Sequence, residues 1–119
     1  METFDQIVQR QKDNIQQFET CWDAVNGSRG EATKARAEQL AIEDTFGTPE
    51  GSNQAARDKW VRQKQKDSTR WVALEAEVSG AAAVVAENEG RKEALKYTIR
   101  LTERELEYAI AEKRGTNND

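Results

Sequence analysis

The chain has 119 residues, of which 36% are hydrophobic and 34% charged, and its formal net charge is −4. This length fits one domain with one modest core, and the composition is typical of long helices with a narrow buried stripe. With no histidine and one cysteine, the chain cannot form an internal disulfide, a cysteine-based zinc site or a histidine-activated nucleophile.

The sequence has no segment suited to a membrane or to secretion. Its longest apolar run, residues 81–86, is far shorter than the roughly 20 residues of a transmembrane helix. The start of the sequence, Met1–Asp5, lacks the basic region and apolar run of a secretory signal. We therefore expect a cytoplasmic protein without a membrane partner.

The first predicted helix covers about residues 3–26. Thr3 is suited to cap its start, and Asn26-Gly27 to end it. Along it, mostly apolar residues recur at alternating steps of four and three, which is the heptad pattern of a coiled coil. These seam residues are Phe4, Val8, Gln11, Ile15, Phe18, Trp22 and Val25.

The second predicted helix covers about residues 31–46 and follows a turn signal at Asn26–Gly30. It ends before Gly47–Ser52, the segment that contains the single proline, Pro49. Its buried face is expected to consist of Ala32, Ala35, Gln39, Ile42 and Phe46.

The third predicted helix is the longest, from about residue 53 to 114, and residues 115–119 are expected to be a disordered tail. From Trp71 onward a heptad seam is again present. Its members are Trp71, Leu74, Val78, Ala81, Val85, Asn88, Lys92, Leu95, Ile99, Thr102, Leu106 and Ala109.

The third helix is longer than the first two helices can cover. Either it folds back at Gly80 or Gly90, or it overhangs and needs another chain. We favour the overhang and therefore a homodimer. The residues expected to form the self-association seam are Leu95, Ile99, Leu106 and Ile110.

Asn88 and Lys92 interrupt the third seam near Gly90. A polar seam residue can set the register and oligomeric state of a coiled coil. Alternatively, the seam ends there or Gly90 is a hinge, and all three interpretations stay open.

The predicted fold class is all-α: a single helical domain over residues 1–114, with two shorter helices packed on a long C-terminal helix in a bundle or coiled-coil-like assembly.

The most asymmetric charge pattern lies in residues 57–70, which contain six basic and two acidic residues. On a helix these basic residues would form a face for an acidic protein surface or a nucleic-acid backbone. The alternative is a solvated face balanced by the acidic second helix. The residues expected to bind a partner are Lys59, Trp60, Arg62, Lys66 and Arg70.

The many carboxylates lie off the apolar seams, and no histidine accompanies them, so we predict no catalytic residue, metal site or cofactor.

A short tyrosine motif lies in residues 108–112. Tyr108-Ala109-Ile110-Ala111-Glu112 resembles the Tyr-x-x-x-Asp/Glu signal of small helical proteins exported by type VII secretion, the WXG100-like families. That resemblance implies an exported helical hairpin. The chain lacks those families' Trp-x-Gly turn, and its three predicted helices differ from their single hairpin.

These patterns favour a non-enzymatic protein–protein interaction module. It would be an adaptor, an assembly component or a stoichiometric inhibitor of a larger protein, in the manner of small phage or mobile-element accessory proteins. A nucleic-acid-associated protein is the first alternative, and a type VII secretion substrate is the second.

Overall fold

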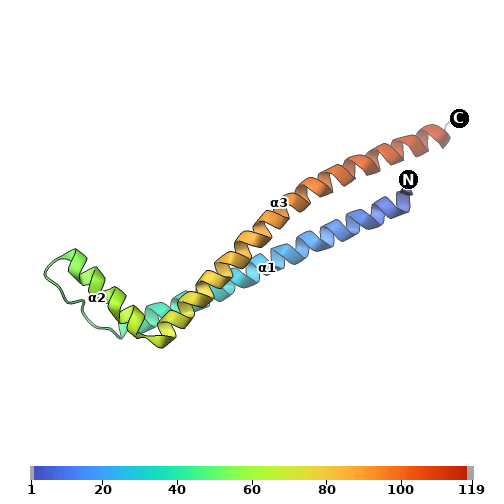
Figure 1. Ribbon diagram of the computed structural model, residues 1–119. Coiled ribbons are helices and arrows are strands. Elements are labelled where there is room, and N and C mark those ends of the chain that lie inside the picture. The colour runs from blue at the N-terminus through green and yellow to red at the C-terminus, as the bar shows by residue number, and fades with distance from the viewer. Residues whose placement is uncertain (1, 118–119) are drawn as a thin grey trace. The chain divides into compact units, whose positions relative to one another are not determined.

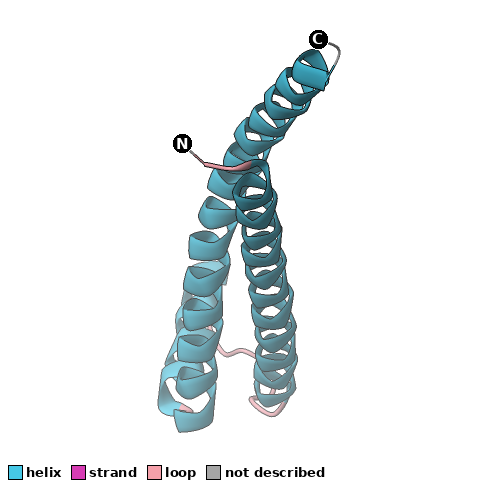
Figure 2. Cartoon of the chain, turned by 90° about the vertical axis from the view of Figure 1, so that its right-hand side faces the viewer, coloured by secondary structure: helices cyan, strands magenta, loops and turns pink. Residues whose placement is uncertain are grey.

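The computed structural model describes residues 2–117, and that part of the chain consists of helices and loops without a strand (Figure 2). The helices are α1 (Phe4–Asp44), α2 (Gln54–Asp67) and α3 (Thr69–Asn117) (Figure 1). The long C-terminal helix packs against the long N-terminal helix and the short one. The predicted all-α fold class is thus confirmed.

α1 is continuous through Asn26–Gly30, so the predicted break between residues 26 and 31 is wrong. Gly27 and Gly30 each cost about 1 kcal/mol relative to alanine in a helix. The cost is offset because the buried seam continues past both glycines, with Val25 and Ala35 only 0% and 3% exposed. Burial of a continuous face therefore outweighs the local turn signal.

The third predicted helix is instead divided at Ser68, whose backbone is extended (φ −89°, ψ 106°). Its N–H donates to the carbonyl oxygen of Gln65 at 3.2 Å and ends α2. Its side-chain oxygen accepts from the N–H of Trp71 at 3.2 Å and caps α3. No glycine or proline marks this break, so the sequence pattern did not reveal it.

The loop before α2 ends with two residues that fix its entry. Gly51 has a φ of +148°, and a β-carbon there would come within 2.8 Å of Ala56 and of the Arg57 nitrogen. Asn53 then caps α2, its side chain accepting from the Ala56 N–H at 2.9 Å. Glycine is therefore required at position 51.

α3 continues through Gly80 and Gly90 to Asn117, without the fold-back considered from the sequence. Three residues of the predicted disordered tail, 115–117, are therefore helical. The last two residues of that tail, 118–119, lie outside the described residues.

The contacts divide the chain into two compact units. Unit 1 contains the residues up to Val25 and those from Ala86 onward, and unit 2 contains Asn26–Val85. Both units contain a segment of α1 and a segment of α3. Because the two helices run through both units, the predicted single domain over residues 1–114 stays a prediction.

In unit 1, α1 and α3 lie side by side and antiparallel (Figure 1). Gln11 Nε2 donates to the carbonyl oxygen of Ile99 at 3.0 Å, and Asn14 Nδ2 to Thr102 Oγ1 at 3.3 Å. Further towards the N-terminus, Arg10 forms an ion pair with Glu105. The buried residues of this unit are Ile7, Gln11, Asn14, Cys21 and Val25 of α1 and Lys92 and Thr102 of α3.

In unit 2, α1 contacts both other helices. Gln39, only 1% exposed, donates to Glu75 Oε2 of α3 at 2.8 Å and to the Trp71 carbonyl oxygen at 3.3 Å. Gln65 of α2 donates to Glu43 of α1 at 2.6 Å. α2 contains no buried residue, so polar contacts and half-buried side chains hold it in place.

Candidate interaction surfaces

The exposed apolar residues of α1 in unit 1 share one face of the helix. Their steps of four and seven keep them on that face. Phe4 is 36% exposed, Ile15 43% and Trp22 45%, while Val8 is half-buried. We call Phe4, Val8, Ile15 and Trp22 the α1 stripe. A solvent-facing stripe of this kind typically marks an interaction site.

The α1 stripe was expected to be part of the buried seam, and that expectation is wrong for its exposed members. α3 instead packs against the neighbouring positions Ile7, Asn14 and Cys21. Gln11, Phe18 and Val25 fit a heptad seam with the α1 stripe and equally well a seam with Ile7, Asn14 and Cys21. The spacing of the residues alone therefore does not show which of these two sides of α1 faces α3. The structure turns the more polar flank inward.

The inward flank contains a polar layer formed by Gln11, Asn14 and Thr102. These side chains are 8%, 8% and 0% exposed. Asn14 donates to Gln11 at 3.2 Å and to Thr102 at 3.3 Å, and Thr102 donates to the Thr98 carbonyl at 2.9 Å. Because each group has a partner, the desolvation cost of burying it is largely offset.

Lys92 is buried behind the α1 stripe, with 5% exposure. Its Nζ lies 3.8 Å from the centroid of the Trp22 ring and 3.3 Å from Glu89 Oε2. The ring and the carboxylate together stabilise the buried ammonium group. The seam therefore does not end at Asn88 and Lys92, and its lysine is held by an aromatic residue of the other helix.

Charged residues border the α1 stripe. A hollow of about 300 Å³ beside it is lined by Phe18, Glu19, Trp22, Lys92 and Lys96. At the other end, Lys113 Nζ lies 5.5 Å from the Phe4 ring centroid. On the opposite flank of α1, Arg10 is held by Glu105 and by Glu2 at 2.9 Å. The hydrogen bond to Glu105 raises the pKa of Arg10 above its ordinary value, so this guanidinium stays charged.

α3 has an exposed apolar surface of its own in unit 1. Tyr97, Leu101 and Tyr108 are 65%, 41% and 68% exposed and follow steps of four and seven. They share a face that differs from the seam through Ile99 and Thr102. We call these three residues the outer α3 stripe.

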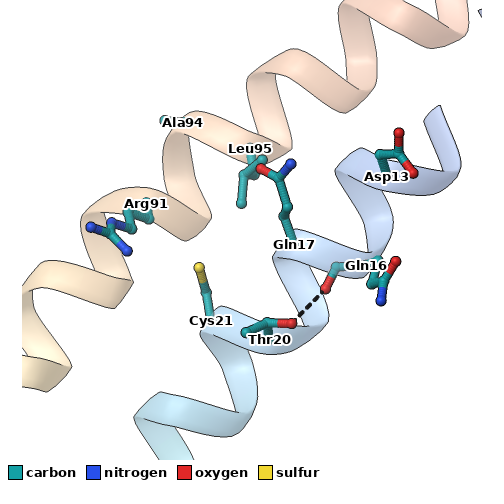
Figure 3. Close-up of a pocket in the computed structure, with 8 residues that line it drawn as sticks. All are labelled: Asp13, Gln16, Gln17, Thr20, Cys21, Arg91, Ala94 and Leu95. Carbon is teal, nitrogen blue, oxygen red and sulfur yellow. Dashed lines mark hydrogen bonds between the residues drawn. The ribbon is translucent and has the colours of Figure 1, made fainter. Parts of the chain in front are cut away.

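A hollow of about 670 Å³ lies between α1 and α3 in unit 1. The Cys21 sulfur points towards it, and the Thr20 hydroxyl donates to the Gln16 carbonyl at 3.0 Å (Figure 3). The described residues include no cluster of three or more acidic or cysteine side chains able to hold a metal ion. Cys21 is a free and buried cysteine at this interface.

The predicted self-association residues lie where α1 covers α3. Leu95, Ile99 and Leu106 are half-buried, and Ile110 is 39% exposed. The expected overhang is wrong, because α1 has 41 residues and pairs with α3 in both units. Self-association through these four residues stays a prediction without that argument.

The predicted basic face is divided by Ser68. Lys59, Arg62 and Lys66 are exposed on α2, where Trp60 is half-buried with Lys64 5.3 Å from its ring centroid. Arg70 belongs to α3 and pairs with Glu38 of α1 at 2.8 Å. The five residues therefore do not form one helical face, because their helical spacing ends at Asp67.

No helix in the described part of the chain is both long and apolar enough to cross a membrane. Comparison with protein-family models, curated proteins and solved structures finds no match for this chain.

Proposed function

We propose that this protein is a non-enzymatic protein–protein interaction module that binds its partner through the α1 stripe. An adaptor, an assembly component or a stoichiometric inhibitor would each use such a surface. The proposal rests on the orientation of α1 in unit 1. The helix presents Phe4, Ile15 and Trp22 to solvent while it buries Gln11 and Asn14 against α3.

This orientation is costly for a chain that acts alone. Burial of apolar surface contributes about 25 cal/mol per Å², whereas buried amides contribute little beyond the cost of their desolvation. A partner that covers Ile15 and Trp22 buries their apolar surface, and this burial contributes free energy to binding. Single exposed apolar residues are ordinary, but a run of them on one face over five turns supports a binding role.

A polyanion-binding role remains the alternative. α2 carries five basic and two acidic residues and has no buried residue. It receives less support than the α1 stripe, because Arg70 is separated from Lys59, Arg62 and Lys66 and is paired with Glu38.

Site-specific crosslinking tests the proposed surface. A photoreactive phenylalanine analogue at position 15, in the protein expressed in its native cells, is expected to yield a crosslinked protein adduct. The control places the same analogue at Lys34, an exposed residue of unit 2. Absence of any protein adduct from position 15, or equal yields at the two positions, contradicts the proposed function.

A further inference from the structure

The α1 stripe and its border are arranged almost symmetrically about Ile15. Val8 and Trp22 lie seven residues before and after it. Lys12 and Glu19 share another edge of the same helix and lie three residues before and four after Ile15. An antiparallel copy of this surface would therefore place Val8 opposite Trp22, and Lys12 opposite Glu19.

α3 repeats this arrangement at the same level. The bonds from Gln11 to Ile99 and from Asn14 to Thr102 place this part of α1 beside residues 99–102. Lys96 lines the hollow beside Trp22, and Glu103 follows seven residues later on the same helical face. The midpoint between this lysine and this glutamate thus lies within about one helical turn of Ile15.

We propose that the α1 stripe binds the α1 stripe of a second copy of this chain, antiparallel, with the two-fold axis at Ile15. This inference rests on the proposed function and names its partner. A two-fold interface uses the same surface on both chains, so each residue must meet its complement across the axis. Lys12 and Glu19 satisfy that condition by charge, and so do Lys96 and Glu103.

The charged groups of α1 are available for such contacts. Neither Lys12 nor Glu19 has an ion-pair partner among the described residues, and both are exposed. Lys96 pairs with Glu93 of its own helix at 3.1 Å, an exposed contact that can be exchanged. The charges of Lys12 and Glu19 are therefore not neutralised by ion pairs within the described part of the chain.

The chain as a whole also exposes more surface than a compact protein of its mass. The chain exposes 8756 Å². A monomeric protein of 13.5 kDa exposes about 6,500 Å². The surplus of about 2,200 Å² exceeds the roughly 800 Å² that each partner buries in a stable interface. This surplus belongs to the chain as a whole, and the exposed parts of Ile15 and Trp22 contribute to it.

A charge exchange tests the pairing. Lys12→Glu alone and Glu19→Lys alone each place like charges together at both ends of a two-fold interface. Sedimentation equilibrium at low salt is expected to show a dimer dissociation constant raised roughly tenfold by either change. The double variant K12E/E19K restores opposite charges and is expected to return to within about threefold of the original value.

The rescue reports on contacts between chains. Residues 12 and 19 are seven apart, about 10.5 Å along α1, too far for an ion pair within one helix. The matched control is Arg104→Glu, which changes the net charge by the same amount at an exposed position away from the stripe. It is expected to leave the dissociation constant unchanged.

Three outcomes would overturn the second copy as the partner. The protein could be monomeric at every concentration, the single reversals could have no larger effect than R104E, or the double variant could fail to recover. If position 15 still crosslinks to another protein, the proposed function survives and the partner is a different chain. If no protein adduct forms there, both proposals fail.

Discussion

At the scale of single residues, the polar layer of unit 1 fixes the register of α1 against α3 as much as its apolar contacts do. Thr102 is completely buried, and its hydroxyl accepts from Asn14 and donates to the Thr98 carbonyl. A helix that slid by one turn would bury the Asn14 amide against a side chain that cannot accept its proton. Buried polar groups that require one another thus fix the register of the pair.

The coupling between Asn14 and Thr102 can be measured. Thr102→Val leaves the Asn14 amide without one acceptor, and we expect it to lower the free energy of unfolding by about 1 kcal/mol. In an Asn14→Leu background the same change is expected to cost almost nothing, because no amide is left unpaired. Urea unfolding at one fixed protein concentration gives both values.

Thr98→Val serves as the control for that cycle. Thr98 is exposed, and its hydroxyl bonds only to the Ala94 carbonyl of its own helix. Its cost should be the same in both backgrounds. Equal costs for Thr102→Val in the two backgrounds would show that the polar layer contributes no coupling.

At the scale of elements, the continuity of α1 is the main departure from the sequence-based prediction. Asn26–Gly30 has the composition of a turn, yet the helix continues through it. A β-carbon at Gly27 or Gly30 would meet no atom within 4 Å, so neither glycine is needed for a close contact. The glycines therefore only weaken a helix that tertiary packing maintains.

This continuity predicts the effect of alanine at both positions. Gly27→Ala and Gly30→Ala are each expected to raise the free energy of unfolding by up to about 1 kcal/mol, because alanine is the better helix former. Chemical denaturation monitored by circular dichroism measures the change. A left-handed turn at either glycine would give the opposite result, since alanine is strained there.

Gly51→Ala is the contrasting control. At a φ of +148°, with Ala56 and Arg57 atoms within 2.8 Å of its β-carbon, alanine at position 51 should destabilise the entry to α2. Stabilisation at Gly51 as well would mean that the three substitutions act only through the unfolded chain.

Periodicity predicted α3 better than α1 or α2. All twelve predicted seam residues from Trp71 to Ala109 are buried or half-buried, because α3 has one coherent seam. α1 has two flanks around shared positions such as Phe18, and only the packed structure shows which flank α3 covers. The division at Ser68 depends on a serine cap, and no glycine or proline accompanies it to mark the break in the sequence.

At the scale of the whole molecule, unit 1 has two exposed apolar surfaces. The α1 stripe contains Ile15 and Trp22, and the outer α3 stripe contains Tyr97 and Leu101. A module that associates with itself through the first surface keeps the second free for another protein. The proposed role as an adaptor or an assembly component would use both surfaces in this way.

The mass of the protein in solution tests the central claim, that the α1 stripe binds a second copy. Light scattering coupled to size-exclusion chromatography is expected to approach about 27 kDa as concentration rises, twice the 13.5 kDa of one chain. Ile15→Glu should remain at 13.5 kDa, while Leu101→Glu on the outer α3 stripe should dimerise like the unaltered protein. A mass of 13.5 kDa for the unaltered chain at every concentration, or a dimer that I15E leaves intact, would contradict the account.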